Sequence, residues 1–539
     1  MTTTSGIDPP RGLARSSVTI AAGTLTSRVT GLVRVAVTLA VLGGTRLTDV
    51  YNAANTTPNI VYELLLGGVL TASLMPLFVK ADAEHDDGAT ASIFTFALAG
   101  LLLLTALAVL AAPVVAHLFT ANAPVKVRAD AHAVGTLLVV MFMPQMLFYG
   151  FTALATAALN ARRRFVAAAY APALNNVVVV ALMLTIHDRL VSCPASSGSS
   201  CSLRYAHAHE SLVVVLGIGT TAGIATMAVA LVPALRRAGI HVFTIGAVWR
   251  HPAVHRLIRL SGWTVGYVVT NQLALAFILW ITPDKGSALT QYQSAFIFFQ
   301  LPHGLIAVSI MTAIVPEFAR AANRGDIDAL RHHFRLGLRW LLLTITPAAA
   351  GYLVLARPII ETVLGHGRFN TASAVSGTAH ALAGFAVGLV AFSVYLYTLR
   401  IYYAQGDTRT PFFVNAAENA INIVAAAVLF PLWGVGGLGL AYSVAYGITA
   451  LVVLMVLHRS IGGVLDGAVA ATFARAVAAA VLAAGAAWLA VHELGSSAAG
   501  LAAACGAGIL TYGVALVLLR DPTITAGITT IRRRYAARM

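Results

Sequence analysis

The chain has 539 residues, of which 58% are hydrophobic and only 10% are charged, whereas a soluble protein carries about 25% charged residues. Repeated apolar stretches of about 20 residues or more therefore predict an all-α membrane protein that crosses the bilayer many times. The formal net charge of +15 does not indicate nucleic-acid binding, because the arginines lie in short loops between apolar stretches, where they orient a membrane protein. Residues 1–17 are polar and the first apolar helix is long, so we expect no cleaved signal peptide.

The apolar pattern predicts about fourteen transmembrane helices, each near the length that a bilayer requires. We expect these spans at residues 19–43, 57–78, 91–118, 134–159, 165–186, 212–235, 257–281, 288–314, 338–364, 381–403, 412–432, 438–457, 468–491 and 498–519.

Loop charge predicts the orientation of these spans in the cytoplasmic membrane. With the N-terminus inside, basic residues of the inner segments, such as the run 162–164, outnumber those of the outer loops by about three to one. The even number of spans then places both termini in the cytoplasm. It also places Cys193 and Cys201 in one outer loop, where a disulfide bond would persist, although spacing alone does not prove that one forms.

A weak internal repeat predicts the domain organisation. The sequence MPLFVKA at residues 75–81 returns as VPEFARA at residues 315–321. Each half holds six predicted spans, and an even number brings both halves into the membrane from the same side, as in a parallel repeat. We expect two six-helix lobes, at residues 1–245 and 246–460, followed by two extra helices and a basic cytoplasmic tail at 461–539.

The first two spans carry more polar residues than lipid-facing helices would tolerate. On the first span these residues form one stripe about 120° wide; they are Thr24, Ser27, Arg28, Gly31, Arg34 and Thr38. Arg34 lies roughly 22 Å along the helix axis, too deep to reach the near surface easily. Because exposing an arginine to lipid at that depth costs about 3 kcal/mol or more, we expect the stripe to face a polar cavity.

These residues also resemble a known family. SRVTGLVR at residues 27–34 is similar to the S-R-x-x-G-x-x-R signature of the MurJ (MviN) family, and further family landmarks follow along the chain. They are TDVY at 48–51, PN at 58–59, GG at 67–68, PLF at 76–78, QLPHG at 300–304, VP at 315–316, GHGRF at 365–369, RIYYA at 400–404, Asp407 and TP at 410–411.

The resemblance implies a lipid II flippase of the multidrug/oligosaccharidyl-lipid/polysaccharide exporter superfamily. Such a protein is a monomeric transporter with two lobes around a central cavity, and its last two helices form a groove for the lipid tail. It would carry lipid II, a polyprenyl-diphosphate-linked peptidoglycan precursor, from the inner to the outer leaflet by alternating access. Membrane lipids and other cell-wall synthesis proteins are the further partners expected, and nucleic acid is not.

The chain also departs from the family pattern, so its cavity should be less cationic than usual. Tyr62, Glu63 and Ile297 stand where family members commonly have arginines, and Leu66 and Val35 stand where acids are common.

We expect the substrate site to contain arginines, because a guanidinium offers a planar fork of donors that suits diphosphate oxygens. The candidates for substrate binding are Arg28, Arg34, Asp49, Asn59, Glu63, Arg256 and Arg400. Plainer roles are open for several of them. Arg28 and Arg34 could pair with Asp49 or Glu63 inside a closed bundle, Asp49 could be the N-cap of the second helix, and Arg256 and Arg400 could be orientation charges.

A second polar group lies on the span at 412–432. Asn415, Glu418, Asn419 and Asn422 recur at three- and four-residue spacing, so they share one helix face. Grouped oxygen ligands suit Na⁺ or a proton, while the alternative is hydrogen bonding between helices. The expected driving force is such a cation or the membrane potential, and no other cofactor is expected.

The sequence contains no P-loop, no metal-ligand cluster and no nucleophile motif, so an enzyme or an ATP-driven pump is not expected. Three alternatives stay open: a flippase for another polyprenyl-linked glycan, a multidrug antiporter of the same superfamily, and a membrane scaffold for cell-wall enzymes. In the scaffold, the cavity arginines would be dispensable.

Overall fold

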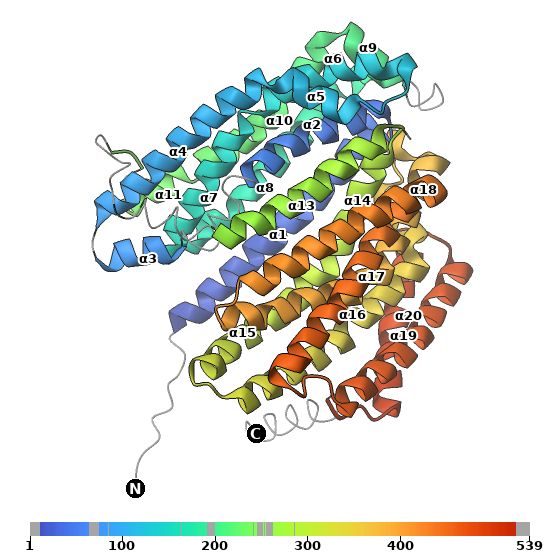
Figure 1. Cartoon of the computed structure of the whole chain (residues 1–539). Coiled ribbons are helices and arrows are strands. Elements are labelled where there is room, and N and C mark those ends of the chain that lie inside the picture. Colours follow the sequence, from blue (N-terminus) through green and yellow to red (C-terminus); the bar gives the residue numbers. More distant parts are fainter. Residues whose placement is uncertain are drawn as a thin grey trace. The chain divides into compact units, whose positions relative to one another are not determined.

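The computed structural model describes residues 11–63, 75–84, 86–162, 164–190, 200–240, 242–244, 252, 254, 262–284 and 286–523, and every regular element in these ranges is a helix (Figure 1). Within them, eleven helices are long and apolar enough to cross a membrane. This confirms the prediction of an all-α polytopic membrane protein. The chain divides into two compact units, Met1–Gln272 and Leu273–Met539.

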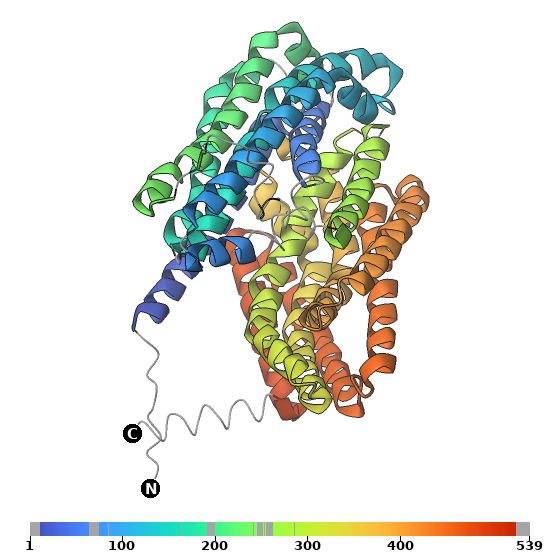
Figure 2. The ribbon, with the colours of Figure 1, turned by 60° about the vertical axis from the view of Figure 1, so that its left-hand side comes forward.

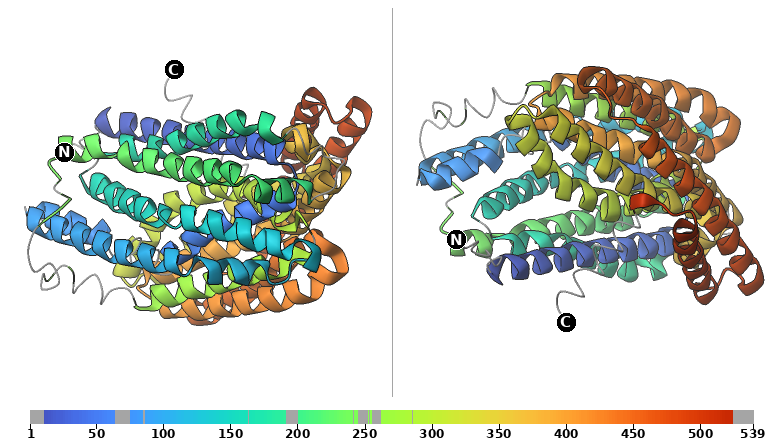
Figure 3. Two further views of the ribbon diagram at one scale, coloured as in Figure 1. Left: turned by 90° about the horizontal axis from the view of Figure 1, so that it is seen from above. Right: turned by 90° about the horizontal axis from the view of Figure 1, so that it is seen from below.

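Unit 1 is a bundle in which α1 packs against α8, and α7 contacts both α4 and α10 (Figure 3). Its helices are α1 Arg11–Leu42, α2 Arg46–Tyr62, α3 Met75–Ala83, α4 Asp87–Leu110, α5 Ala112–Thr120, α6 Val125–Phe142, α7 Gln145–Ala161, α8 Phe165–Ile186, η3 Asp188–Leu190, α9 Cys201–Ala208, α10 Glu210–Val229, α11 Val232–Arg237 and α13 Gly262–Ile281, which continues into unit 2.

The start of α2 corrects one expectation from the sequence. Gly43 ends α1 with a φ of +75°, and Thr45 then caps α2 by accepting a hydrogen bond from the Thr48 amide at 3.4 Å. The helix therefore begins at Arg46 and not near residue 57. Asp49 lies inside the first turn, so the suggestion that it is the N-cap is wrong. An acid in the first turn instead interacts favourably with the positive end of the helix dipole.

Unit 2 is built around α17, which packs against α14, α16 and α18, while the C-terminal pair α19 and α20 lies beside α16 (Figure 2). Its helices are η6 Thr282–Asp284, α14 Ala288–Pro302, the π-helix η7 His303–Ala307, α15 Val308–Asn323, α16 Ile327–Leu364, η8 Gly367–Phe369, α17 Ala372–Ala404, α18 Arg409–Ile461, α19 Gly467–Leu494 and α20 Ala498–Leu518.

Two arginines near the start of α16 hold the connection between α18 and α19. Arg331 donates to the Ile461 carbonyl and Arg335 to the Gly463 carbonyl, each through Nε at 2.6 Å. Arg335 also forms an ion pair at 3.2 Å with Asp466, the residue that caps α19 through the Val469 amide. These contacts fix the start of the C-terminal helix pair, α19 and α20, against α16.

The outer loop expected to carry a disulfide is described only in part. Cys201 at the start of α9 is disulfide-bonded, and Cys505 on α20 is a free thiol. Cys193 lies outside the described residues, so the pairing of Cys193 with Cys201 stays a prediction.

A glycine divides α18 into the two spans expected at 412–432 and 438–457. Gly434 has φ 59° and ψ −141°, which is not helical. A residue with a Cβ is strained in that region, whereas glycine adopts it readily. The break therefore depends on the residue type at this position.

We predict that Gly434→Ala lowers stability by on the order of 1–3 kcal/mol, the usual cost of such backbone strain. Gly447→Ala is the matched control, because Gly447 lies on the same helix and a Cβ there meets no atom within 4 Å. The measurement is thermal unfolding of the two purified variants in detergent. Equal melting temperatures would show that the break does not require glycine.

Candidate functional site

The face of α1 that carries the polar stripe also contacts α8. The Asn176 amide group of α8 donates to the Ser27 carbonyl at 3.3 Å and to the Thr30 hydroxyl at 3.0 Å, and a Cβ on Gly31 would lie 3.6 Å from the same amide. Small residues allow membrane helices to approach closely and to exchange such hydrogen bonds. Part of the stripe is thus a helix–helix contact, which leaves the two arginines as its charged members.

Arg34 is half-buried among polar groups of unit 1. Its charge lies within electrostatic reach of Tyr51 on α2 and of Tyr149 on α7. Tyr149 also shares a hydrogen bond with the Asn59 side chain, and Tyr51 shares one with the Thr220 hydroxyl at 2.9 Å. The guanidinium therefore lies in polar surroundings at membrane depth, which avoids the free-energy cost of exposing an arginine to lipid.

Arg28 lies on the exposed part of the same helix. No ion pair joins Arg28 or Arg34 to Asp49 or Glu63, although the structure describes all four residues. Among the described residues, the closed-bundle interpretation, in which acids neutralise these arginines, therefore has no ion pair to support it. Within the described part of the chain, both guanidinium groups could accept an anion without first breaking an ion pair.

The remaining candidates of unit 1 differ in their surroundings. Asp49 is buried, and Asn59 and Glu63 are half-buried near the end of α2. Asn59 is linked to the surroundings of Arg34 through Tyr149. Arg256 lies outside the described residues, as do Leu66 and the Gly67–Gly68 pair, and for Tyr62 only the backbone is described. The roles expected for them stay predictions.

The structure brings the four polar residues of the span at 412–432 together inside unit 2. Asn415, Glu418, Asn419 and Asn422 are all buried on α18, and Glu418 is only 1% exposed. The Asn419 amide group donates to the Asn415 carbonyl at 2.9 Å, while the Glu418 Oε1 atom is buried and accepts no hydrogen bond from the described residues. An unsatisfied carboxylate oxygen in such a position needs a proton or a cation to offset its desolvation.

Arg400 and Asp407 belong to another family landmark, at the end of α17 and the start of α18. Arg400 is exposed and lies within electrostatic reach of the buried His303, whose Nδ1 is 3.0 Å from the Ser393 hydroxyl. Asp407 accepts the amides of Arg409 and Thr410 at 2.9 and 3.0 Å. Partial burial acts to raise the pKa of Asp407, but these hydrogen bonds and the Arg409 charge outweigh it, and the pKa is lowered.

The site candidates named from the sequence omit three residues that surround them: Tyr51, which belongs to the TDVY landmark, Tyr149 and Asn176. Tyr149 is on α7, far from Arg34 in sequence, and nothing in its local sequence marks it. For Asn176 a signal existed, because Pro172 followed by Asn175 and Asn176 matches Pro411 followed by Asn415 and Asn419. In both helices these asparagines are buried, so the repeat marks helix positions that need polar partners.

Comparison with known proteins shows which family the chain resembles. The sequence model of the family described as "Lipid II flippase MurJ" matches residues 39–498. "Probable lipid II flippase MurJ" of Rhizobium meliloti (strain 1021) is 28% identical over 454 residues, which cover 83% of this chain and 80% of that protein. "Lipid II flippase MurJ" of Burkholderia cenocepacia is 26% identical over 460 residues, covering 83% and 84%.

Solved structures are similar in fold. "Lipid II flippase MurJ, inward closed conformation" superposes with a TM-score of 0.75 at 19% identity, covering 94% of this chain and 99% of that one. A multidrug resistance MATE family transporter of the MOP superfamily gives a TM-score of 0.65 at 13% identity, covering 81% and 95%. The fold is thus that of this transporter superfamily, and because the family match extends over most of the sequence, the chain belongs to the lipid II flippase MurJ family.

Proposed function

We propose that this protein moves lipid II from the inner to the outer leaflet of the cytoplasmic membrane by alternating access. Membership in the MurJ family supports this function, and it does not favour the multidrug, other-glycan or scaffold alternatives. The observation that carries the proposal at the level of residues is the position of Arg34. It is a guanidinium at membrane depth with no ion pair in the described part of the chain, surrounded by hydroxyl and amide groups.

The chemistry of Arg34 suits a lipid-linked diphosphate. Diphosphate oxygens accept paired, charge-assisted hydrogen bonds from a guanidinium, and such bonds strengthen where water is scarce. When no substrate is bound, the arginine lies near the polar groups of Tyr51, Tyr149 and Asn59, which do not neutralise its charge. The headgroup would cross along this polar surface while the polyprenyl tail stays in lipid, and the protein makes no covalent bond to it.

Membrane orientation follows from the charge of the loops. We infer that both termini and the turn at 162–164 lie in the cytoplasm, while residues 196–200 lie outside. We expect a monomer in the cytoplasmic membrane, in contact with other proteins of cell-wall synthesis.

The buried group on α18 supports a proposal for energy coupling. A proton or Na⁺ bound at Glu418, with Asn415, Asn419 and Asn422 on the same face, would neutralise a carboxylate that is otherwise expensive to bury. A bound cation moving through the membrane potential gains about 2.3 kcal/mol per charge per 100 mV. This is enough to bias the lobes between two states.

We predict that Arg34→Ala and Arg28→Ala each reduce lipid II flipping by tens- to a hundredfold, since one charge-assisted contact is worth about 2–3 kcal/mol. Neither change leaves an acid without its ion-pair partner, so both variants should reach the membrane folded. Arg34→Lys keeps the positive charge but loses the planar fork of N–H donors, so this variant should be partly active. The measurement is lipid II exposure at the outer surface of cells depleted of the wild-type protein.

Arg459→Ala is the control for these variants, because Arg459 is an exposed arginine in the last turn of α18. Full complementation by Arg28→Ala and Arg34→Ala at normal expression would refute the anion-binding role. The scaffold function would then be favoured.

We predict that Glu418→Gln folds normally and abolishes the response of flipping to an imposed Na⁺ or pH gradient. Glutamine keeps the shape of the side chain but carries no charge that a cation must neutralise. Glu493→Gln is the control, since Glu493 is exposed at the end of α19. The measurement is flipping in proteoliposomes with and without each gradient, and an unchanged response in Glu418→Gln would exclude this residue from coupling.

Orientation is tested with single cysteines in a background that lacks Cys193, Cys201 and Cys505. Ser199→Cys should react with an impermeant maleimide in intact cells, whereas Asn323→Cys, at the last residue of α15, should react only after permeabilisation. The opposite pattern would invert the proposed topology.

A further inference from the structure

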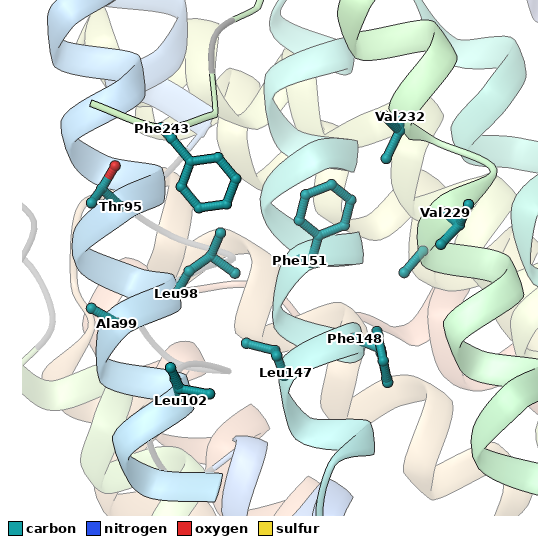
Figure 4. Close-up of a pocket in the computed structure, with 11 residues that line it drawn as sticks. Thr95, Leu98, Ala99, Leu102, Leu147, Phe148, Phe151, Val229, Val232 and Phe243 are labelled. Atoms are coloured by element: carbon teal, nitrogen blue, oxygen red, sulfur yellow. The ribbon is translucent and has the colours of Figure 1, made fainter. Parts of the chain in front are cut away.

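A pocket opens in unit 1 between α4, α7 and α10, away from the arginines of α1. Its volume is about 520 Å³, and carbon atoms form almost the whole of its lining (Figure 4). Leu98 and Leu102 come from α4, Phe148 and Phe151 from α7, and Val229 from α10. The floor of the pocket joins a buried apolar core that contains Leu98 and Leu101 and against which Leu147 and Phe151 pack.

The pocket lies at the depth of lipid hydrocarbon. Its lining on α4 runs from Thr95 to Leu102, roughly 12 to 22 Å from the start of that helix at 1.5 Å per residue, and a bilayer core is about 30 Å thick. The rim is nevertheless open, because Leu102 is 60% and Val229 is 62% exposed. Since no water is available at this depth, whatever fills the pocket is hydrocarbon.

A short non-helical segment closes one end of the pocket. The Phe243 ring, 70% exposed, extends from this segment into the space between α4 and α7 (Figure 4). The Thr244 amide donates to the Thr95 hydroxyl at 3.0 Å. Backbone N–H groups outside helices are expensive at membrane depth unless they have a hydrogen-bond partner. This hydrogen bond supplies a partner for the Thr244 amide, and it holds Phe243 over α4.

A cationic group lies just beyond the pocket. Val232 lines the pocket on α11, and Arg236 follows it by four residues, on the same helix face. Arg236 is exposed, while Arg162, at the end of α7, is engaged with Asp82 at 2.9 Å and with the Ala238 carbonyl. A phosphate attached to a chain in the pocket would therefore meet Arg236 at the surface.

We propose that this pocket is a binding site for one acyl chain of a bilayer phospholipid, whose phosphate is held by Arg236. A volume of about 520 Å³ lies within the range of pockets that take one small apolar ligand, and a single acyl chain is such a ligand. None of its lining residues is a candidate for substrate binding, and a lipid bound there would pack α4 against α7 and α10.

The test uses Ala99→Phe, which places a ring in the pocket from an exposed position of α4, where it should not disturb folding. Ala106→Phe is the matched control, an exposed alanine of the same helix that lies outside the pocket lining. The full-length protein is stripped of lipid in detergent and titrated with dioleoyl phosphatidylglycerol, with binding followed by native mass spectrometry and by melting temperature.

We expect one tight phospholipid on the wild-type protein and on Ala106→Phe, and at least tenfold weaker binding to Ala99→Phe. Phe243→Ala and Arg236→Ala should each weaken binding severalfold. Equal affinity of Ala99→Phe and Ala106→Phe would overturn the site. Displacement of the phospholipid by a polyprenyl diphosphate would overturn its assignment to a bilayer lipid and give the pocket to the substrate tail.

Discussion

The absence of water in the bilayer governs the placement of every polar side chain in the spans of this protein. A polar group there must have a partner inside the bundle or lie where polar groups gather. The asparagines of α8 and α18 satisfy this requirement in two ways. Asn176 bonds to the neighbouring α1, whereas Asn419 bonds within its own helix beside a carboxylate that lacks a hydrogen bond at Oε1 among the described residues. The first is a structural contact between two helices, and the second is the group for which we propose cation coupling.

The same constraint separates the two arginines of α1 from the other basic residues. Arg331 and Arg335 are engaged by carbonyls and acids near the ends of their helices, so their charge is used to fix the fold. Arg34 is surrounded by tyrosine and asparagine side chains and has no acid to pair with in the described residues. A neutral polar environment limits the cost of burying the charge and leaves its donors available, which is what reversible binding of an anion needs.

The sequence predicted much of the fold because the hydrophobic signal of a membrane helix is long and strong. The span at 165–186 coincides with α8, and the break between the eleventh and twelfth spans falls at Gly434. Prediction was poorer where helices begin with polar residues: α2 starts at Arg46 because Thr45 and Thr48 form its cap. The sequence could not predict the residues around Arg34, for a different reason. Tyr149 lies near Arg34 because of how α7 packs. Contacts between segments far apart in the sequence produce no periodic pattern that a single sequence could show.

The departures from the family pattern have a physical counterpart in this arrangement. The resemblance predicts arginines at the positions of Tyr62 and Ile297, so the proposed anion-binding role would depend on fewer cations, and each would contribute more. Hydroxyl groups would partly compensate, because Tyr51 and Tyr149 place polar groups near Arg34 without adding repulsion between like charges. A site with fewer charges costs less to keep in the membrane when it is empty.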